Sequence, residues 1–477
     1  MQSRPRARVA LLVALAVLSL AARLFLLLHR PLWHDEIFTV WAARLAPPEL
    51  VSALATDSGP PLFYVLERPF ARAADSPARD PLVRALPFAA GLALFFAVFT
   101  LPRGGARAWW IVLGACLALG NLYSAEARAY APLALGCLAV FHLSILAPET
   151  TGRLASLFLV AAATLWMHYL ALFAVAAALV LALGLRRVRA AIVLVAALTS
   201  FGPWLPVLLA QPPGAMAWLR DPPASAISGF LSALGGVGRI PAPFGPTPPT
   251  ALFAAGAVVG ATLAALLARD ARNDSAVRGA LLFVLIVLGL ALGASLWRPV
   301  AFAGRSEMAV LPVWMWAVAR ATPGRRALAG AAAAASVLGL ATTLFVAAGP
   351  HPRSTAAAAV DSVARLARPG DTVVAGPGFY LPALLAADQG RLKARLVALP
   401  AGDASHPGWF VAWPLSADDV GVAERAADET SPGSRLFLLL PPAYSQAALM
   451  DPLARRGNLR ELVRQPDGVL TVWTPRN

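Results

Sequence analysis

The chain has 477 residues, of which 58% are hydrophobic and only 14% are charged, and its net charge is +15. Soluble proteins carry about 25% charged residues, so this composition excludes an ordinary soluble protein and indicates a chain that crosses a membrane several times. The charge does not indicate a nucleic-acid binder, because the basic residues are spread along the chain, many in short loops between apolar runs. Two cysteines without a spacing motif indicate neither a disulfide framework nor a zinc site.

The first apolar run covers residues 9–28 and is long enough to cross a bilayer. A basic stretch precedes it, as in a signal peptide, but the sequence that follows, "HRPLWHDE", has no small-residue cleavage site. We therefore expect a retained first helix. The apolar runs together predict about eleven spanning helices. Their expected positions are 8–28, 84–101, 108–122, 130–147, 154–167, 169–185, 190–209, 250–268, 279–296, 308–320 and 327–347.

The loops between these helices fall into two sets. Those of the first set are short and mostly basic: 4–8, 102–107, 148–153, 186–189, 269–278 and 320–326. The positive-inside rule places them and the N-terminus in the cytoplasm, and an odd number of spans then places the C-terminus outside. The opposite loops are 29–83, 122–130, 210–249 and 297–307. They hold the acids Asp35, Glu36, Asp57, Glu67, Glu126 and Glu307.

The composition changes after residues 345–354, which divides the chain into a membrane domain, 1–349, and a C-terminal domain, 350–477. Apolar stretches bounded by proline and glycine predict buried strands in the second domain, at 371–380, 408–414 and 434–442. Amphipathic stretches predict helices at 355–367 and 447–457. Alternating strands and helices are typical of a small α/β domain with a mainly parallel sheet. The glycine-rich "AGPGF" lacks GxGxxG spacing and favours a strand-to-helix turn over a nucleotide loop.

Four polar segments occur in the loops expected outside. They are "WHDEIFTVWAARL" (33–45), "DSGPPLFYVLERPF" (57–70), "LYSAEARAYAPLAL" (122–135) and "WRPVAFAGRSEMAVLP" (297–312). The first places Asp35 and Glu36 at the start of an expected interfacial helix. Acids there complement a helix N-terminus, so helix capping alone is one interpretation of this pair. The other three segments favour a second interpretation.

In their order along residues 1 to about 350, the four segments resemble the multi-spanning GT-C glycosyltransferases, in particular bacterial relatives of the protein O-mannosyltransferases and of the lipid A aminoarabinose transferase. That family has Asp-Glu or a similar acid in the first external loop, then a Pro-Pro-Leu-Tyr-like stretch, then Glu-Ala-Arg-x-Tyr before the fourth span. The chain departs from the pattern at 301–312. There it has Arg305 and Pro312, but not the tyrosine that follows the arginine in many relatives.

The resemblance implies an α-helical polytopic membrane protein, GT-C-like, with about eleven transmembrane helices and a C-terminal extracytoplasmic α/β domain. It implies an inverting glycosyltransferase that moves a sugar from a polyprenyl-phosphate donor to a glycan, lipid or protein acceptor on the outer face of the membrane. The arginine-rich and alanine-rich composition favours a bacterium, and hence the bacterial cytoplasmic membrane. No cofactor is required by this interpretation.

The residue types fit such a reaction. Charge builds on the departing phosphate as the anomeric C–O bond breaks, and a guanidinium binds phosphate bidentately, which Arg128 and Arg305 are placed to do. A carboxylate within hydrogen-bond reach of the acceptor hydroxyl serves as general base. We expect Asp35 in that role, with Glu36 beside it as the second catalytic acid. The expected substrate-binding residues are Asp57, Tyr64, Glu126, Arg128, Tyr130, His168 and Arg305.

Several alternatives stay open at this point. Arg128 can pair with Glu126, and Arg305 with Glu307. The set His34, Asp35, Glu126 and His168 offers ligands for a divalent metal, although packing or substrate hydrogen bonds also explain both histidines. For the whole chain, the main alternative is a lipid or solute transporter or flippase. Two observations argue against it: the charged residues gather on one face of the membrane, and the sequence shows no internal repeat of the kind that many transporters carry. A structural or signalling membrane protein would not explain the four segments.

Overall fold

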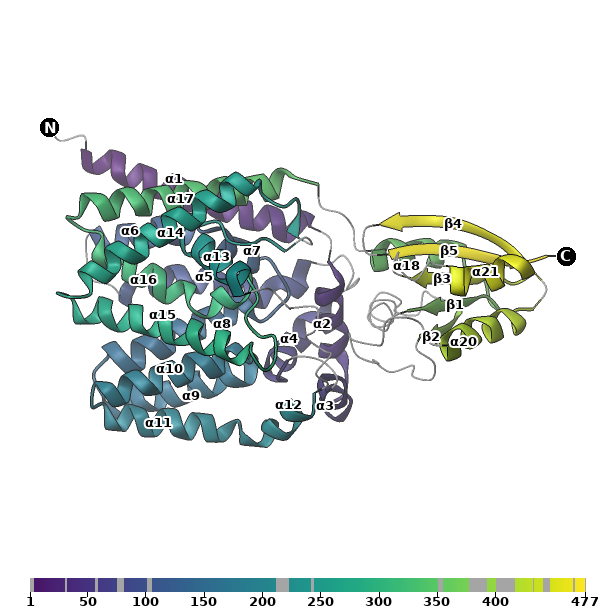
Figure 1. The fold of residues 1–477 in the computed structure, drawn as a ribbon, viewed down its shortest axis with the longest axis horizontal. Coiled ribbons are helices and arrows are strands. Elements are labelled where there is room, and N and C mark those ends of the chain that lie inside the picture. The colour runs from purple at the N-terminus through teal and green to yellow at the C-terminus, as the bar shows by residue number, and fades with distance from the viewer. Residues whose placement is uncertain are drawn as a thin grey trace.

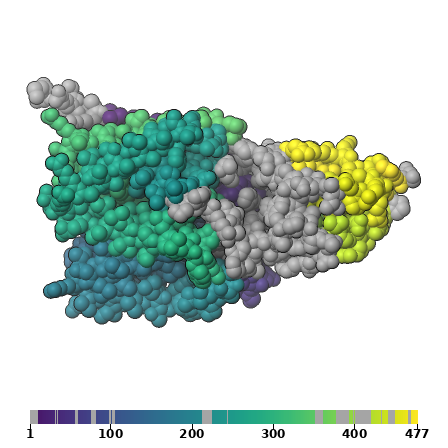
Figure 2. Space-filling view, viewed as in Figure 1, coloured from purple at the N-terminus to yellow at the C-terminus, as the bar shows by residue number. Residues whose placement is uncertain are grey.

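The computed structural model describes residues 4–30, 32–55, 59–74, 81–100, 105–211, 223–241, 244–350, 355–376, 393–399, 417–431, 433–440, 447–465 and 468–476. A block of packed helices forms one part of the molecule, and a smaller α/β unit forms the other (Figure 1). The first described helix begins at the end of the helical block that is farther from the α/β unit (Figure 1). Figure 2 shows these two parts at opposite ends of the molecule.

Each of the eleven apolar segments contains a helix or a pair of helices. These are α1 (Arg4–His29), α5 (Ala85–Phe96), α6 (Gly105–Cys116) with α7 (Ala118–Tyr123), α8 (Tyr130–Phe141), α9 (Thr151–Met167), α10 (Leu170–Gly184), α11 (Val188–Ser200) with α12 (Leu205–Ala210), α14 (Thr250–Asp270), α15 (Ser275–Ala294), α16 (Leu311–Ala321) and α17 (Arg326–Ala348). The described segments that are long and apolar enough to cross a membrane are Ala10–His29, Val188–Ala210, Thr250–Asp270, Ser275–Ala294 and Arg326–Ala348. The helical fold is confirmed, and the number of eleven spans stays a prediction.

A further helix lies where the sequence predicts only a loop, within 210–249. It is α13 (Pro223–Leu234), and it packs against α14. Glycines let the two backbones meet, because a Cβ on Gly235 would lie 1.9 Å from the carbonyl oxygen of Gly256. No helix is expected here from the sequence, because α13 has 12 residues, fewer than the about 20 that a spanning helix needs.

Three helices lie at the end of the block nearer the α/β unit: α2 (His34–Arg44), α3 (Pro47–Ala55) and α4 (Leu62–Ala73) (Figure 1). α2 confirms the helix expected after Trp33. Arg44 donates two hydrogen bonds, of 2.7 and 2.9 Å, to the Ala71 carbonyl, and Arg68 donates one of 3.1 Å to the Ala43 carbonyl. These bonds satisfy carbonyls that helix ends leave without partners. They tie α2, which carries Asp35 and Glu36, to α4.

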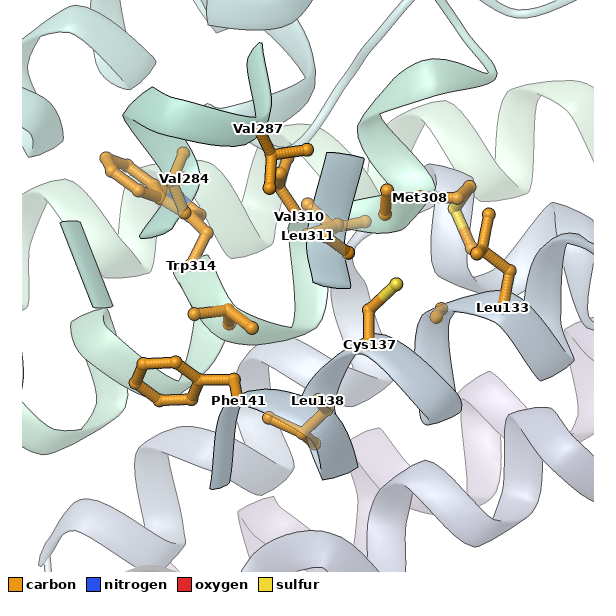
Figure 3. Packing of buried hydrophobic residues seen from close by; sticks show 14 of the residues in the cluster. Leu133, Cys137, Leu138, Phe141, Val284, Val287, Met308, Val310, Leu311 and Trp314 are labelled. Atoms are coloured by element: carbon orange, nitrogen blue, oxygen red, sulfur yellow. The ribbon is translucent and has the colours of Figure 1, made fainter. Parts of the chain in front are cut away.

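In the centre of the helical block, α8 packs against α16 and against the turn that precedes α16. Figure 3 shows the side chains of this core, each at most 2% exposed: Leu133, Cys137, Leu138, Phe141, Val284, Val287, Met308, Val310, Leu311 and Trp314. Such interiors are packed as densely as crystals and hold their neighbours in fixed positions. The loop before α8, with Arg128, is thereby held beside the loop before α16, with Arg305.

The C-terminal unit contains a five-stranded sheet in the order β2-β1-β3-β5-β4. Its elements are α18 (Thr355–Leu366), β1 (Thr372–Ala375), β2 (Arg395–Ala398), α20 (Ala417–Asp428), β3 (Leu436–Leu440), α21 (Ala447–Arg456), β4 (Gly457–Gln465) and β5 (Gly468–Pro475). β1 runs parallel to β2 and β3, but the pairs β3–β5 and β5–β4 are antiparallel. The mainly parallel sheet was therefore wrong, because the charged sequence of β4 hides a hairpin. The strand expected at 408–414 lies outside the described residues.

The division of the chain at residues 349 and 350 stays a prediction. α17 ends at Ala348, close to that point. One hydrophobic cluster, however, contains both Ile37 and Val40 of α2 and Val373 and Phe437 of the sheet. The apolar face of α2 and the sheet thus contribute to one buried cluster.

Candidate functional site

An ion pair between Asp35 and Arg305 joins the start of α2 to the loop before α16. Nη2 of Arg305 lies 3.5 Å from Oδ2 of Asp35, and both side chains keep a tenth of their surface exposed, 11% and 12%. The guanidinium carbon lies 5.5 Å from the ring centres of Trp33 and Phe302 and 6.0 Å from that of Tyr130. Aromatic faces attract a cation at these distances. Arg305 is therefore fixed without being sealed from solvent.

The backbone before Arg305 is held by two side chains, Glu307 and Tyr123. Gly304 has a φ of +94°, a conformation that glycine adopts at little cost. Its N–H donates to both carboxylate oxygens of Glu307 at 2.9 Å, and its carbonyl accepts a hydrogen bond from the Tyr123 hydroxyl. A Cβ at this position would lie 2.1 Å from the Arg239 carbonyl oxygen. The turn thus requires a glycine and sets the direction in which Arg305 leaves the backbone.

Glu36 is fully buried, and both of its carboxylate oxygens accept hydrogen bonds. Arg84 binds it through Nε at 2.7 Å and Nη2 at 2.8 Å, and Arg30 donates from Nη2 at 3.1 Å. The backbone N–H of Ala127 adds a bond of 2.8 Å, and that of Trp33 one of 3.3 Å. Burial alone would raise the pKa of Glu36, but Arg30, Arg84 and these hydrogen bonds hold it below its usual value. Glu36 therefore links three segments as a permanent anion.

Glu126 lies behind the Asp35–Arg305 pair and is 1% exposed. Its Oε1 accepts a hydrogen bond of 3.0 Å from the Trp33 indole N–H, while its buried Oε2 has no hydrogen-bond partner. Burial raises the pKa of this carboxyl to about 7; Arg30 and Arg305 oppose that rise, and Glu36 and Asp35 add to it. Arg128, two residues along the chain, is half-buried.

His168 lies in the short connection between α9 and α10. Its ring centre is 5.1 Å from that of Tyr130, and its Nδ1 accepts the Leu170 backbone N–H at 3.1 Å. Burial, together with the charges of Arg128 and Arg305, lowers its pKa to about 3. The imidazole is therefore neutral at physiological pH. Tyr130, His168 and the two arginines, all expected from the sequence to bind substrate, come together at this point.

The other expected residues lie elsewhere or are not described. Tyr64 packs its ring 6.0 Å from that of Phe38 and 5.9 Å from that of Phe63, between α2 and α4. Glu67 is fully buried on α4, and neither of its carboxylate oxygens has a hydrogen-bond partner. Asp57 and the side chain of His34 lie outside the described residues.

Within the described part of the chain, no three His, Cys, Asp or Glu side chains are grouped so as to hold a metal ion. Of the ligands considered from the sequence, Asp35 is paired with Arg305, and His168 lies in the field of two arginines. A cation would be repelled there. The described residues therefore fit a metal ion poorly, and a metal requirement stays a prediction.

Sequence reasoning overlooked Arg30, Arg84, Trp33, Tyr123 and Gly304. A signal existed for the two arginines. Arg30 lies in the loop expected outside, 29–83, and Arg84 begins the span expected at 84–101, so both are at the face where the positive-inside rule predicts few cations. Cations in that position are better explained by nearby acids such as Glu36 than by topology.

Comparisons with known proteins identify the fold. No family model matches the chain, and neither does any curated protein. Among solved structures, it is similar to the aminoarabinose transferase ArnT from Cupriavidus metallidurans in the apo state, with 13% identity, a TM-score of 0.57 and coverage of 98% of both chains. ArnT bound to undecaprenyl phosphate gives 13% identity, a TM-score of 0.54, and coverage of 99% of this chain and 98% of that one. The archaeal oligosaccharyltransferase AglB from Archaeoglobus fulgidus gives 12% identity, a TM-score of 0.47, and coverage of 98% of this chain and 74% of that one.

The likeness to ArnT extends over nearly the whole of both chains, including the C-terminal unit. It therefore confirms the GT-C-like fold that the sequence motifs predicted.

Proposed function

We propose that the chain is an inverting glycosyltransferase, which moves a sugar from a polyprenyl-phosphate donor to a cell-envelope acceptor on the outer face of a bacterial cytoplasmic membrane. The observation that carries this proposal is the Asp35–Arg305 pair, which keeps about a tenth of its surface exposed and has Arg128 and His168 close by. A carboxylate and guanidinium groups are the two kinds of group that the reaction needs. ArnT, whose fold the chain shares, has been solved with undecaprenyl phosphate bound.

The proposed chemistry assigns a role to each of these residues. The acceptor hydroxyl attacks the anomeric carbon while Asp35 takes its proton. The anomeric C–O bond breaks, and its electron pair stays on the polyprenyl phosphate, whose growing charge Arg305 and Arg128 stabilise. Attack from the side opposite to the phosphate inverts the anomeric centre.

Glu36 takes a positioning role in this proposal rather than a catalytic one. Its carboxylate already accepts bonds from Arg84, Arg30 and two backbone N–H groups, and it is fully buried. It therefore has no accessible lone pair for a substrate proton. Through Arg84 and Ala127 it keeps Asp35 beside the loop that carries Arg128.

The orientation in the membrane is likewise a proposal: a cytoplasmic N-terminus and an extracytoplasmic C-terminal unit. Contacts among the basic loops support it. Arg187 pairs with Glu149, Arg320 with Asp274, and Arg325 with Asp270. The basic loops thus pair with acids of their own set, and none of these pairs includes Asp35 or Arg305. Reporter fusions after Gly349 and within 186–189 test the orientation, and a cytoplasmic signal after Gly349 would contradict it.

The function is tested by mass spectrometry of envelope glycolipids and glycoproteins from cells that produce the wild type, Asp35→Asn or no protein. We expect one product that is heavier by a single sugar, present with the wild type alone. Identical profiles in all three would contradict the proposal. Movement of a labelled polyprenyl-phosphate sugar across vesicles without a new glycoside would favour the transporter instead.

A further inference from the structure

We infer that His168 binds the phosphate of the donor as a neutral hydrogen-bond donor through its Nε2–H, and is neither a metal ligand nor an acid–base group. The inference rests on the proposed function and names a specific contact within that site. Its observations are the tautomer of the ring, the position of the ring against Tyr130, and the two neighbouring guanidinium groups.

The tautomer follows from one hydrogen bond. Nδ1 accepts the backbone N–H of Leu170 at 3.1 Å, so it carries no proton itself. A neutral imidazole with an acceptor at Nδ1 has its proton on Nε2. The backbone therefore presets His168 as a donor at the nitrogen that Leu170 does not occupy.

The surroundings keep the ring neutral and in place. Arg128 and Arg305 both act on His168 electrostatically, and a third positive charge beside them is unfavourable. The ring lies 5.1 Å from Tyr130, whose own ring lies 6.0 Å from the Arg305 guanidinium carbon. His168 and Arg305 thus meet around one aromatic side chain. A phosphate bound there receives ionic bonds from arginine and one directional bond from a neutral N–H.

A structural role has to be separated from this one, because the Leu170 N–H at the start of α10 has His168 as its acceptor. An N-cap acceptor on such a group contributes about 1 kcal/mol to a helix. Asparagine reaches the same N–H with its side-chain oxygen but has no donor at the place of Nε2. Glutamine reaches that place with its amide N–H₂. The variants His168→Asn and His168→Gln therefore separate the cap from the donor.

The experiment measures binding of undecaprenyl phosphate to the purified full-length chain in nanodiscs, together with thermal stability. We expect His168→Asn to melt like the wild type but to bind the lipid at least about tenfold more weakly, whereas His168→Gln recovers most of the affinity. Between about pH 5.5 and 7.5, where the lipid phosphate and Glu126 themselves titrate, the wild type and His168→Gln should show the same pH dependence of binding, because His168 stays neutral throughout.

Three results overturn the inference. If the wild type binds undecaprenyl phosphate and His168→Asn binds it equally well, His168 only caps α10, and the proposed function is unaffected. If the wild type itself does not bind the lipid, the proposed function fails, and this contact fails with it. A destabilised His168→Asn protein leaves His168→Gln as the deciding variant: a folded His168→Gln protein that binds no better than His168→Ala contradicts a donor at Nε2.

Discussion

Arg84 donates two hydrogen bonds, of 2.7 and 2.8 Å, to the carboxylate of Glu36, which lies 48 residues earlier in the sequence. The arginine lies just before α5 and the glutamate lies in the first turn of α2, and both are at most 1% exposed. Removing one partner of such a buried pair leaves an uncompensated charge. The pair therefore determines whether Asp35, one residue away, keeps its place.

Glu36→Gln should lower stability by about 3–5 kcal/mol, since it leaves Arg84 and Arg30 without their anion. Thermal unfolding in detergent measures the loss. Glu149→Gln is the matched control, because the pair of Glu149 with Arg187 is 3.8 Å long and partly exposed; its loss should be about 0–1 kcal/mol. Equal melting of the two variants would show that Glu36 does not hold these segments together.

Asp35→Asn should fold like the wild type and lower transfer by at least about 10²-fold, the lower range for a general base. Its pair with Arg305 is 3.5 Å long, and asparagine keeps the size of the side chain and one of its oxygens, so we expect the fold to be retained. Single-turnover transfer with saturating donor lipid measures the effect. A well-folded Asp35→Asn protein with near-normal turnover would remove Asp35 from the mechanism.

The buried carboxyl of Glu67 should make the stability of the protein depend on pH. Burial, together with Glu36, raises its pKa to about 9, whereas a glutamate in the unfolded chain titrates near about 4.3. Between these values the folded state binds more protons than the unfolded state, so stability falls as pH rises, by up to about 1.4 kcal/mol per pH unit. Glu67→Gln removes this titration. Melting curves from about pH 6 to 8 should diverge, with the variant the more stable at high pH, and parallel curves would refute a protonated Glu67.

Gly304→Ala should weaken binding of the donor lipid by about tenfold or more, because its Cβ would lie 2.1 Å from the Arg239 carbonyl oxygen and force the turn before Arg305 to move. Gly324→Ala is the control. Gly324 also has a positive φ, +80°, but has no atom within 4 Å of the added Cβ. It shares the backbone strain without the clash. Binding that falls equally in both variants would mean that the turn does not position Arg305.

The sequence predicted those features that depend on local pattern. Apolar run length located the helices, and the motif around Asp35 located the start of α2. It also named Asp35, Arg128, Tyr130 and Arg305, which the family motifs carry, and His168, which lies at an expected external end of a span, as site residues. Pattern could not decide which acid pairs with which arginine. Arg305 was considered as a partner of Glu307, two residues away, yet Asp35 pairs with it across 270 positions (305 − 35).

The missed features depend on tertiary contacts. α13 forms against α14 through glycines that carry little hydrophobic signal. β4 is an edge strand with three charged side chains among its nine residues, Arg460, Glu461 and Arg464, and only pairing with β5 makes it a strand. Glu36 was grouped with Asp35 by adjacency. A helix turns by about 100° per residue, so neighbours point in different directions, and one is buried while the other faces the site.

The central claim is that Arg305 and Arg128 hold the phosphate of a polyprenyl-phosphate donor, and binding of undecaprenyl phosphate to purified Arg305→Ala and Arg128→Ala proteins tests it most directly. Arg298→Ala is the control, since Arg298 lies seven residues before Arg305 (305 − 298) but donates to the Leu208 and Leu209 carbonyls. We predict that Arg298→Ala binds like the wild type, that at least one of the other two loses binding by about tenfold or more, and that its lysine variant is intermediate, because lysine keeps the charge without the bidentate fork. Wild-type affinity in both Arg305→Ala and Arg128→Ala would contradict the account.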